Sequence, residues 1–214
     1  MFVFSDKNSL VNHFVAELRD ENIQRDSWRF RRNLERLGEV MAYEISKGLD
    51  YQAARIKTPL GVANTYLLSQ QPILATILRA GLPFYQGFLN FFDQAESAFV
   101  GAYRGPMQDD NSFEIVQSYT AAPSLDQKVL ILIDPMLATG RSLVSVYEAL
   151  LRYGLPRQVH VVAAIASRAG TEHLQAHIPE ARLWLGSLDE TLNHKSYIVP
   201  GLGDAGDLAF GNKQ

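Results

Sequence analysis

The sequence of 214 residues contains no cysteine, so disulfide bonds, thiolate metal sites and cysteine nucleophiles are excluded. It also lacks any apolar run long enough to cross a membrane. The first residues, Met1 to Asp6, do not show the basic segment and long apolar core of a signal peptide. These absences predict a soluble, cytoplasmic protein with no membrane partner.

A strong charge of either sign is missing as well. The formal net charge is −3, and acidic and basic residues are interspersed along the chain. This balance argues against general affinity for nucleic acid or for a bilayer. What the chain does have is a large apolar fraction, 47%, which is enough for a full core. Its length suits one domain and no repeat or linker divides it, so we expect residues 1–214 to fold as a single domain.

Residues 1–50 are rich in charge and are predicted to be mainly helical. One helix is expected over residues 8–19. A longer helix begins at Asp26 or Ser27, which are good N-cap residues, and ends near Gly48. Apolar side chains repeat along one face of the longer helix, and we expect this region to serve packing or subunit contact.

Short apolar segments alternate with helical patterns from residue 72 onward. Strands are expected at 73–78, 98–103, 128–133, 158–165 and 182–185, and helices at 83–92, 142–153 and 169–177. This alternation predicts an α/β fold with a mainly parallel sheet flanked by helices. Ligands of such sheets bind at the carboxyl ends of the strands.

Residues 105–123 interrupt this alternation. The segment is polar, carries three consecutive polar residues from Asp109, and continues as an alternating stretch over residues 113–119. A long excursion of this kind in a compact domain is usually functional or disordered. We expect a hairpin arm that projects from the sheet, or a mobile flap.

The most informative segment runs from Val129 to Ser142. Five apolar residues predict a buried strand that ends at Asp134, and a short turn then leads into an amphipathic helix. The free N–H groups and the positive dipole end of that helix form an anion site, and the acid beside it can hold hydroxyls or a metal. The pattern therefore indicates a phosphosugar site rather than an ordinary turn in which Ser142 caps the helix. It is not a Walker loop, because the Gly-Lys-Ser/Thr ending is absent.

A second segment contains Arg79, which follows the strand expected at 73–78 and comes shortly before Gly81 and a helix start. A guanidinium in this position can present two donors to a phosphate. Taken alone, the residue would be assigned to a surface salt bridge.

The third segment is glycine-rich and runs from Tyr197 to Asp207. Its glycine spacing matches a dinucleotide-binding fingerprint, but the sequence stops at Gln214, before the second strand and the acid that this fingerprint needs. We expect instead a loop whose backbone N–H and C=O groups face the edge of a small planar ligand. The alternative is a flexible tail, and Pro200 with the apolar residues before it favours an ordered loop.

Together these segments resemble the uracil phosphoribosyltransferase family of type I phosphoribosyltransferases. That family carries Ile-Leu-Arg-Ala-Gly-Leu, Asp-Pro-Met-Leu-Ala-Thr-Gly-Gly-Ser and Pro-Gly-Leu-Gly-Asp-Ala-Gly-Asp in this order. The matching residues here are 77–82, 134–142 and 200–207. Residues 18–20, 30–31 and 58–60 also resemble the N-terminal half of the family, so the likeness covers nearly the whole chain.

The resemblance implies transfer of a phosphoribosyl group from 5-phospho-α-D-ribose 1-diphosphate to uracil, giving UMP and diphosphate. It implies Mg²⁺ as the cofactor, bound mainly through the diphosphate and not by a protein metal site. It also implies a homo-oligomer, a dimer or a tetramer, and GTP as a candidate effector whose site the sequence does not reveal.

The resemblance assigns site residues by position. For phosphoribosyl diphosphate they are Arg79, Arg104, Asp134, Pro135, Met136, Leu137, Ala138, Thr139, Gly140, Arg141, Ser142 and Asp204. For uracil they are Ile198, Gly203, Asp204 and Ala205. Those expected to act in catalysis are Asp134, Arg79, Arg104 and Asp204.

The roles follow from the same resemblance. The turn at 138–142 holds the 5′-phosphate, and Asp134 accepts hydrogen bonds from the ribose hydroxyls. Arg79 contacts the diphosphate, and Arg104 closes over it at the root of a water-excluding flap. Asp204 lies where the base and the diphosphate meet, and backbone groups around it select uracil.

Three features depart from the family pattern. Arg141 replaces the usual small residue of the phosphate turn, and Leu208 stands where a basic residue is common. The sequence after Arg104 differs from the family's acid-rich stretch, which leaves the flap undefined. Two alternatives are kept: a non-catalytic, RNA-binding regulator that senses uridine nucleotides, and a transferase for another base. The acidic balance counts against the first, and the glycine-rich segment counts against both.

Overall fold

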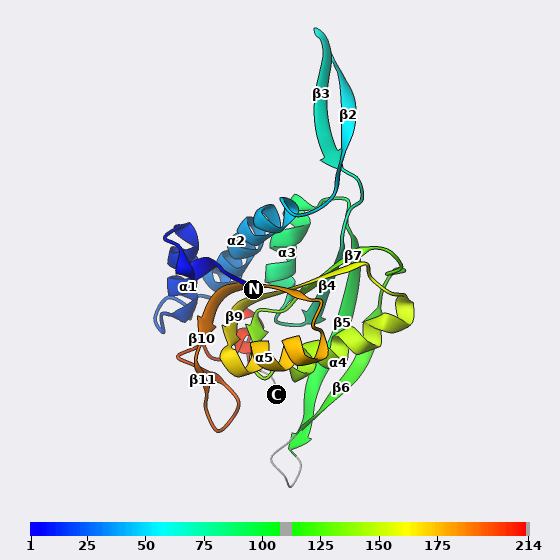
Figure 1. Ribbon diagram of the computed structural model, residues 1–214. Helices are drawn as coiled ribbons and strands as arrows, with labels where there is room; N and C mark the ends of the chain where they lie inside the picture. The colour runs from blue at the N-terminus through cyan, green and yellow to red at the C-terminus, as the bar shows by residue number, and fades with distance from the viewer. Residues whose placement is uncertain (108–112, 213–214) are drawn as a thin grey trace.

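A computed structural model describes residues 1–107 and 113–212 of the protein (Figure 1). Its centre is an eight-stranded sheet in the order β1-β10-β9-β7-β4-β5-β6, with the short strand β8 also paired to β9. The strands are β1 (Phe2–Val3), β4 (Ile73–Leu78), β5 (Glu96–Met107), β6 (Phe113–Ala121), β7 (Val129–Ile133), β8 (Met136–Leu137), β9 (Gln158–Ser167) and β10 (Arg182–Asp189). Every neighbouring pair of this sheet that the structure describes runs parallel except β5 and β6. The predicted α/β fold with a mainly parallel sheet is confirmed.

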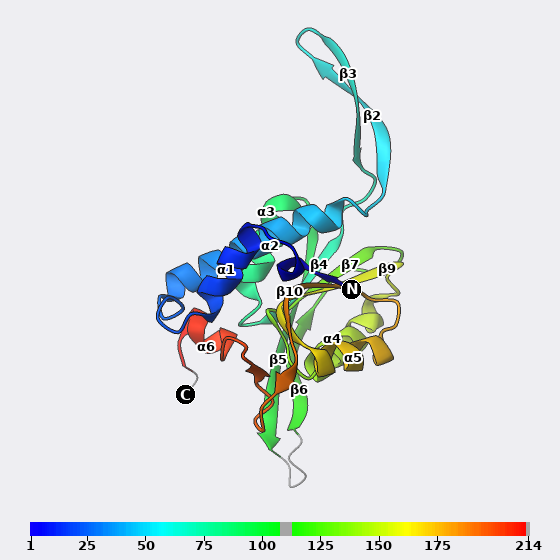
Figure 2. The same cartoon turned by 60° about the vertical axis from the view of Figure 1, so that its left-hand side comes forward.

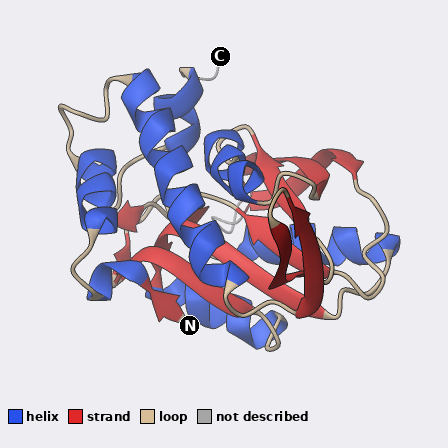
Figure 3. Cartoon of the chain, turned by 90° about the horizontal axis from the view of Figure 1, so that it is seen from above, coloured by secondary structure: helices blue, strands red, loops and turns tan. Residues whose placement is uncertain are grey.

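Helices cover both faces of the sheet (Figures 2 and 3). They are α1 (Leu10–Arg19), α2 (Ser27–Ser46), α3 (Leu82–Phe91), α4 (Arg141–Leu150), α5 (Arg168–His177) and α6 (Ala205–Phe210), with 3-10 turns at Phe4–Asp6 and Leu151–Tyr153. Alternate residues of β7 enter two separate cores: Ile131 packs with α1, α2, α3 and α6, and Leu130 packs with α4 and α5. A strand covered on both sides must be apolar at every position, which explains why β7 has no polar residue.

The two N-terminal helices begin where their capping residues place them. Ser9 and Asn12 form a capping box at the start of α1. The carboxylate of Asp26 accepts hydrogen bonds from the backbone N–H groups of Trp28 and Arg29 at the start of α2. Among the helices that the structure describes, none has the length and apolarity needed to span a bilayer.

Two long hairpins leave the sheet at opposite edges (Figure 1). The amino-edge hairpin consists of β2 (Tyr51–Thr58) and β3 (Gly61–Leu68), which pair only with each other in the described structure and project from the end where β4 begins. No strand is predicted there from the sequence. The carboxyl-edge hairpin consists of β5 and β6 and continues the main sheet beyond the end of β4.

The carboxyl-edge hairpin coincides with the arm expected at 105–123. The prediction of a hairpin is correct, but the two strands start further back and belong to the main sheet, because β5 pairs with β4 from Glu96 to Gly101. Residues 108–112 of the expected arm lie outside the described residues. A small third hairpin of β11 (Thr191–Leu192) and β12 (Ile198–Val199) leads into the glycine-rich segment.

Candidate active site

The predicted site segments meet at the carboxyl edge of the parallel strands. Arg79 follows β4 and Asp134 follows β7, and the two strand ends are adjacent because Thr76 pairs in register with Ile133. The neighbouring strands β9 and β10 end at the same edge, the second of them at Asp189. This is the edge at which open α/β sheets bind their ligands.

Residues 134–142, named the phosphate loop here after their predicted role, turn sharply between β7 and α4. The backbone N–H of Met136 donates to Asp134 Oδ1 at 3.3 Å, and β8 then pairs with β9. The N-cap of α4 is Gly140, whose φ of 77° lies in the left-handed region that favours glycine. Ser142 therefore lies inside the helix and does not cap it, which excludes the alternative of an ordinary serine-capped turn.

Small residues at the start of α5 brace the phosphate loop. The hydroxyl of Ser167, a buried N-cap residue, donates to the carbonyl oxygen of Ala138 at 2.5 Å and accepts from the N–H of Gly170 at 2.9 Å. A Cβ atom at Gly170 would lie 2.3 Å from that same carbonyl oxygen, and one at Gly140 would lie 2.8 Å from the carbonyl oxygen of Gly170. Neither brace residue is among those predicted from the sequence, although a serine before a helix signals an N-cap.

Basic groups flank the phosphate loop on its α5 side. A Cβ atom at Gly140 would lie 3.2 Å from the His173 ring, and the rings of His173 and His177 are 4.2 Å apart. Burial, followed by the positive charges of His177 and Arg141, lowers the pKa of His173 below its usual value of 6.5. Arg141 is exposed at the first position of α4, so its side chain adds positive charge to this side of the loop.

Arg79 connects the second predicted segment to the third. One of its guanidinium nitrogens donates to the carbonyl oxygen of Gly211 at 3.3 Å and lies 3.6 Å from the carboxylate of Asp207. Behind it, a Cβ atom at Gly206 would contact the Cβ of Ala80 at 3.8 Å. The structure thus brings these two segments together, and it adds Asp207, which sequence reasoning did not assign to the site.

The glycine-rich loop, residues 198–206, ends at the N-terminus of α6. Ile198 and Ala205 are buried, and the carboxylate of Asp204 accepts from the N–H of Asp207 at 3.0 Å as the N-cap of α6. Gly203 is exposed, and a Cβ atom there would meet nothing within 4 Å. The space beside Gly203 is therefore open to a ligand.

The remaining catalytic candidate is Arg104, which lies in β5 opposite Ile115 of β6. Its backbone extends beyond the end of β4 at the same edge as the phosphate loop. Its side chain is not among the side chains that the structure describes, so its role stays a prediction. Within the described residues, no cluster of three or more His, Cys, Asp or Glu side chains could hold a metal ion.

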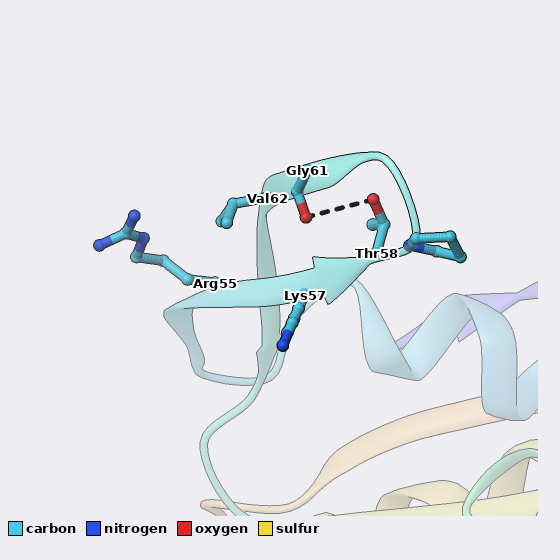
Figure 4. Close-up of a pocket in the computed structure, with 6 residues that line it drawn as sticks. Arg55, Lys57, Thr58, Gly61 and Val62 are labelled. Atoms are coloured by element: carbon cyan, nitrogen blue, oxygen red, sulfur yellow. Dashed lines mark hydrogen bonds between the residues drawn. The ribbon is translucent and has the colours of Figure 1, made fainter.

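A hollow of about 570 Å³ lies elsewhere, on the amino-edge hairpin (Figure 4). Its lining comes from this one ribbon and comprises Arg55, Lys57, Thr58, Pro59, Gly61 and Val62. The Thr58 hydroxyl donates to the carbonyl oxygen of Gly61 at 3.3 Å across the turn (Figure 4). No element of the carboxyl edge reaches this hollow, and we assign no chemistry to it.

The arrangement of sheet and loops defines the class of protein first. A hypoxanthine phosphoribosyltransferase from Staphylococcus aureus superimposes with a TM-score of 0.53 at 14% identity, with 76% of each chain covered. At this identity the likeness shows the fold, which is that of the type I phosphoribosyltransferases. The AQ2163 protein from Aquifex aeolicus superimposes with a TM-score of 0.85 at 32% identity, covering 96% of each chain.

Sequence comparison then gives the family. The family model described as uracil phosphoribosyltransferase matches residues 5–212. A uracil phosphoribosyltransferase from Porphyromonas gingivalis is 51% identical over 97% of this chain and 96% of its own length. Another, from Pyrococcus furiosus, is 36% identical over 98% of this chain and 90% of its own length. The chain belongs to the uracil phosphoribosyltransferase family.

Proposed function

We propose that the protein transfers the phosphoribosyl group of 5-phospho-α-D-ribose 1-diphosphate to uracil, producing UMP and diphosphate. The observation that carries this proposal is the meeting of Arg79, the phosphate loop and the glycine-rich loop at one edge of the sheet, in a chain of this family. Each of the three places suits one part of the reacting pair. The reaction needs no protein nucleophile, because positioning and fixed charge stabilise an oxocarbenium-like ribose.

The donor lies between Arg79 and the phosphate loop in this proposal. Backbone N–H groups of residues 138–142 hold the 5′-phosphate at the start of α4, where the helix dipole adds attraction. Asp134, next to this loop, accepts from the ribose hydroxyls. Arg79 binds the diphosphate, and its present contacts favour this: the side chain is 42% exposed and its ion pair with Asp207 is long, so an incoming diphosphate can replace them.

Uracil lies against the glycine-rich loop. Backbone groups from Gly203 to Ala205 and Ile198 pair with the edge of the base, and the open space at Gly203 supports this placement. A base with a different donor and acceptor pattern, such as cytosine, would leave these groups unpaired. Asp204 lies between base and diphosphate, at the start of α6.

Mg²⁺ fits this site as an ion held mainly by the diphosphate. The carboxylates near the substrates, those of Asp134, Asp204 and Asp207, offer only oxygen, the ligand type that Mg²⁺ prefers. Asp207 Oδ1 is buried and makes no hydrogen bond among the described residues, but it lies 3.6 Å from the guanidinium of Arg79, so it suits a single protein ligand once Arg79 turns to the diphosphate. When bound, the ion would screen the diphosphate and make it a better leaving group.

Closure and assembly complete the proposal. Arg104 and the carboxyl-edge hairpin close over the diphosphate and exclude water.

The amino-edge hairpin exposes Tyr51, Ile56, Leu60, Val62, Tyr66 and Leu67. An isolated two-stranded ribbon is marginally stable in water, so we expect a second copy to cover it in a homodimer or tetramer. We expect the enzyme to act in the cytoplasm, with GTP as a candidate effector.

The direct test is an assay of the purified protein with Mg²⁺, phosphoribosyl diphosphate and uracil, run with and without GTP and repeated with cytosine. We expect UMP to form from uracil only. Absence of UMP together with tight RNA binding would refute the enzyme and support the regulator. Light scattering of the same sample measures the oligomeric state, and a monomer would contradict the role given to the amino-edge hairpin.

Asp204 allows a sharper test because two properties of its side chain, the oxygen that caps α6 and the negative charge, can be removed separately. Asp204→Ala removes both, so it should lower kcat by about 100-fold or more and weaken α6 by about 1 kcal/mol. Asp204→Asn keeps an oxygen that can cap α6, so it should lose kcat to a similar extent while melting like the wild type. Near-normal turnover in Asp204→Asn would show that the carboxylate has no part in catalysis.

A further inference from the structure

An ion pair of two residues that are not among the predicted site residues contacts the glycine-rich loop. Arg19 is the last residue of α1 and Asp189 is the last residue of β10. Their side chains form two parallel hydrogen bonds, with Nη1 to Oδ2 at 2.8 Å and Nη2 to Oδ1 at 2.7 Å. Only 20% and 7% of these side chains are exposed, so the pair is largely shielded from water. A forked guanidinium–carboxylate pair of this kind has a fixed geometry.

Both members of this pair bind the same peptide residue of the loop. Arg19 Nη1 donates to the carbonyl oxygen of Gly201 at 2.9 Å, and the N–H of Gly201 donates to Asp189 Oδ2 at 2.9 Å. Arg19 Nη2 also donates to the hydroxyl of Ser187 at 3.0 Å. This third partner helps to fix the orientation of the guanidinium. The backbone of Gly201 is thus fixed on both sides by charged groups.

The position of the Gly201 backbone influences where the next two residues, Leu202 and Gly203, lie. Leu202 is buried in the core, and Gly203 then emerges at the surface with open space around it. The fixed Gly201 peptide and the buried Leu202 side chain set the point from which the backbone of Gly203 emerges. The direction in which the loop presents its N–H and C=O groups therefore depends on the ion pair.

We propose that Arg19 and Asp189 are positioning residues that hold the glycine-rich loop in the orientation that binds uracil. The inference rests on the proposed function of that loop. Neither residue touches the base; both act through Gly201. The phosphate loop is braced separately by Ser167 and Gly170, so the site proposed for the 5′-phosphate of the donor does not depend on the pair.

The test must remove the hydrogen bonds to Gly201 without leaving a buried charge unpaired. Replacing one partner alone does leave such a charge and destabilises the fold, whereas replacing both by apolar residues of similar volume is often neutral. The double variant Arg19→Met/Asp189→Leu is therefore the main test. We expect its KM for uracil to rise about tenfold, with a smaller change in kcat and with its KM for phosphoribosyl diphosphate within about twofold of wild type.

The residue after Asp189, Glu190, belongs to a second ion pair that serves as a matched control. Arg168 and Glu190 form another forked pair, with both hydrogen bonds at 2.7 Å, and this pair is exposed and makes no described contact with the loop. Arg168→Gln/Glu190→Gln should leave both KM values unchanged. Arg19→Lys supplies a second test if the double variant does not fold: one ammonium cannot reproduce the fork and also reach Gly201, so the KM for uracil should still rise.

The outcomes are distinguishable. A wild-type protein that makes no UMP would refute the proposed function, and the inference with it. Wild-type activity combined with an unchanged KM for uracil in the folded double variant, or in Arg19→Lys, would refute the positioning role alone. Equal rises in both KM values would also refute it, because they would show general damage to the carboxyl edge.

Discussion

The phosphate loop and the glycine-rich loop lie at the same edge of one sheet but are held by different means. The phosphate loop is braced by the Ser167 hydroxyl and by close contact with Gly170, both uncharged. The glycine-rich loop is held by a charged pair, Arg19 and Asp189. A phosphate is an anion, and a carboxylate in the brace beside it would compete with the ligand for the loop's N–H groups. Uracil is neutral, so the loop that we propose for it can be supported by an ion pair without such competition.

Among the changes that test this comparison of the two loops, the largest effect is expected from adding one methyl group to the brace of the phosphate loop. In Gly170→Ala the new Cβ would lie 2.3 Å from the carbonyl oxygen of Ala138, so the loop must shift. A displacement of about 1 Å can cost about 100-fold in rate, and we expect kcat/KM for phosphoribosyl diphosphate to fall by about this factor. Steady-state kinetics with the donor varied measures it.

The same substitution at Gly61 serves as the control. A Cβ atom there would meet nothing within 4 Å, and the residue lies on the amino-edge hairpin. Gly61→Ala should leave the kinetics unchanged. Wild-type kinetics in a folded Gly170→Ala variant would mean that the close contact with Ala138 does not set the position of the phosphate loop.

A smaller effect is expected at Arg141, the residue that departs from the family pattern. Its side chain is exposed, so Arg141→Gly should keep turnover and raise the KM for phosphoribosyl diphosphate by about threefold, as for one surface charge near a phosphate. Arg141→Ala separates loss of charge from added backbone freedom at the start of α4. A folded Arg141→Gly variant without activity would show that the side chain takes part in the reaction itself.

The smallest effect concerns the protonation of His173. The charge of Arg141 contributes to the lowered pKa of this histidine, so its removal in Arg141→Gly should raise that pKa toward 6.5. Binding of inorganic phosphate should raise the pKa for the same reason, since an anion favours the protonated ring. An NMR titration of the His173 ring protons measures both changes, and a pKa that stays constant would place His173 out of electrostatic reach of the loop.

The phosphate loop could be predicted from sequence because its parts are contiguous. The buried strand β7, the acid that ends it and the helix that follows lie within residues 129–150, and their periodicities are strong. Ser167, which braces the loop, lies 29 positions after Ala138, and the sequence around it shows no comparably strong periodicity. The capped start of α5 was the available signal.

Other parts could not be predicted, for physical reasons. The amino-edge hairpin is exposed on both faces, so it shows none of the alternation that reveals a half-buried strand. Arg19 and Asp189 are 170 positions apart, and only the packing of α1 against β10 joins them. The resemblance marked Arg19 within a matching tripeptide, but nothing in the sequence tied it to Gly201.

The link between Arg19 and Gly201 also has a consequence for synthesis of the chain. Because a chain emerges from the ribosome amino end first, α1 and the phosphate loop are available long before Asp189 and Gly201. The contacts that fix the Gly201 backbone therefore form only after Asp189 and Gly201 have emerged, when α1 and the phosphate loop have long been available.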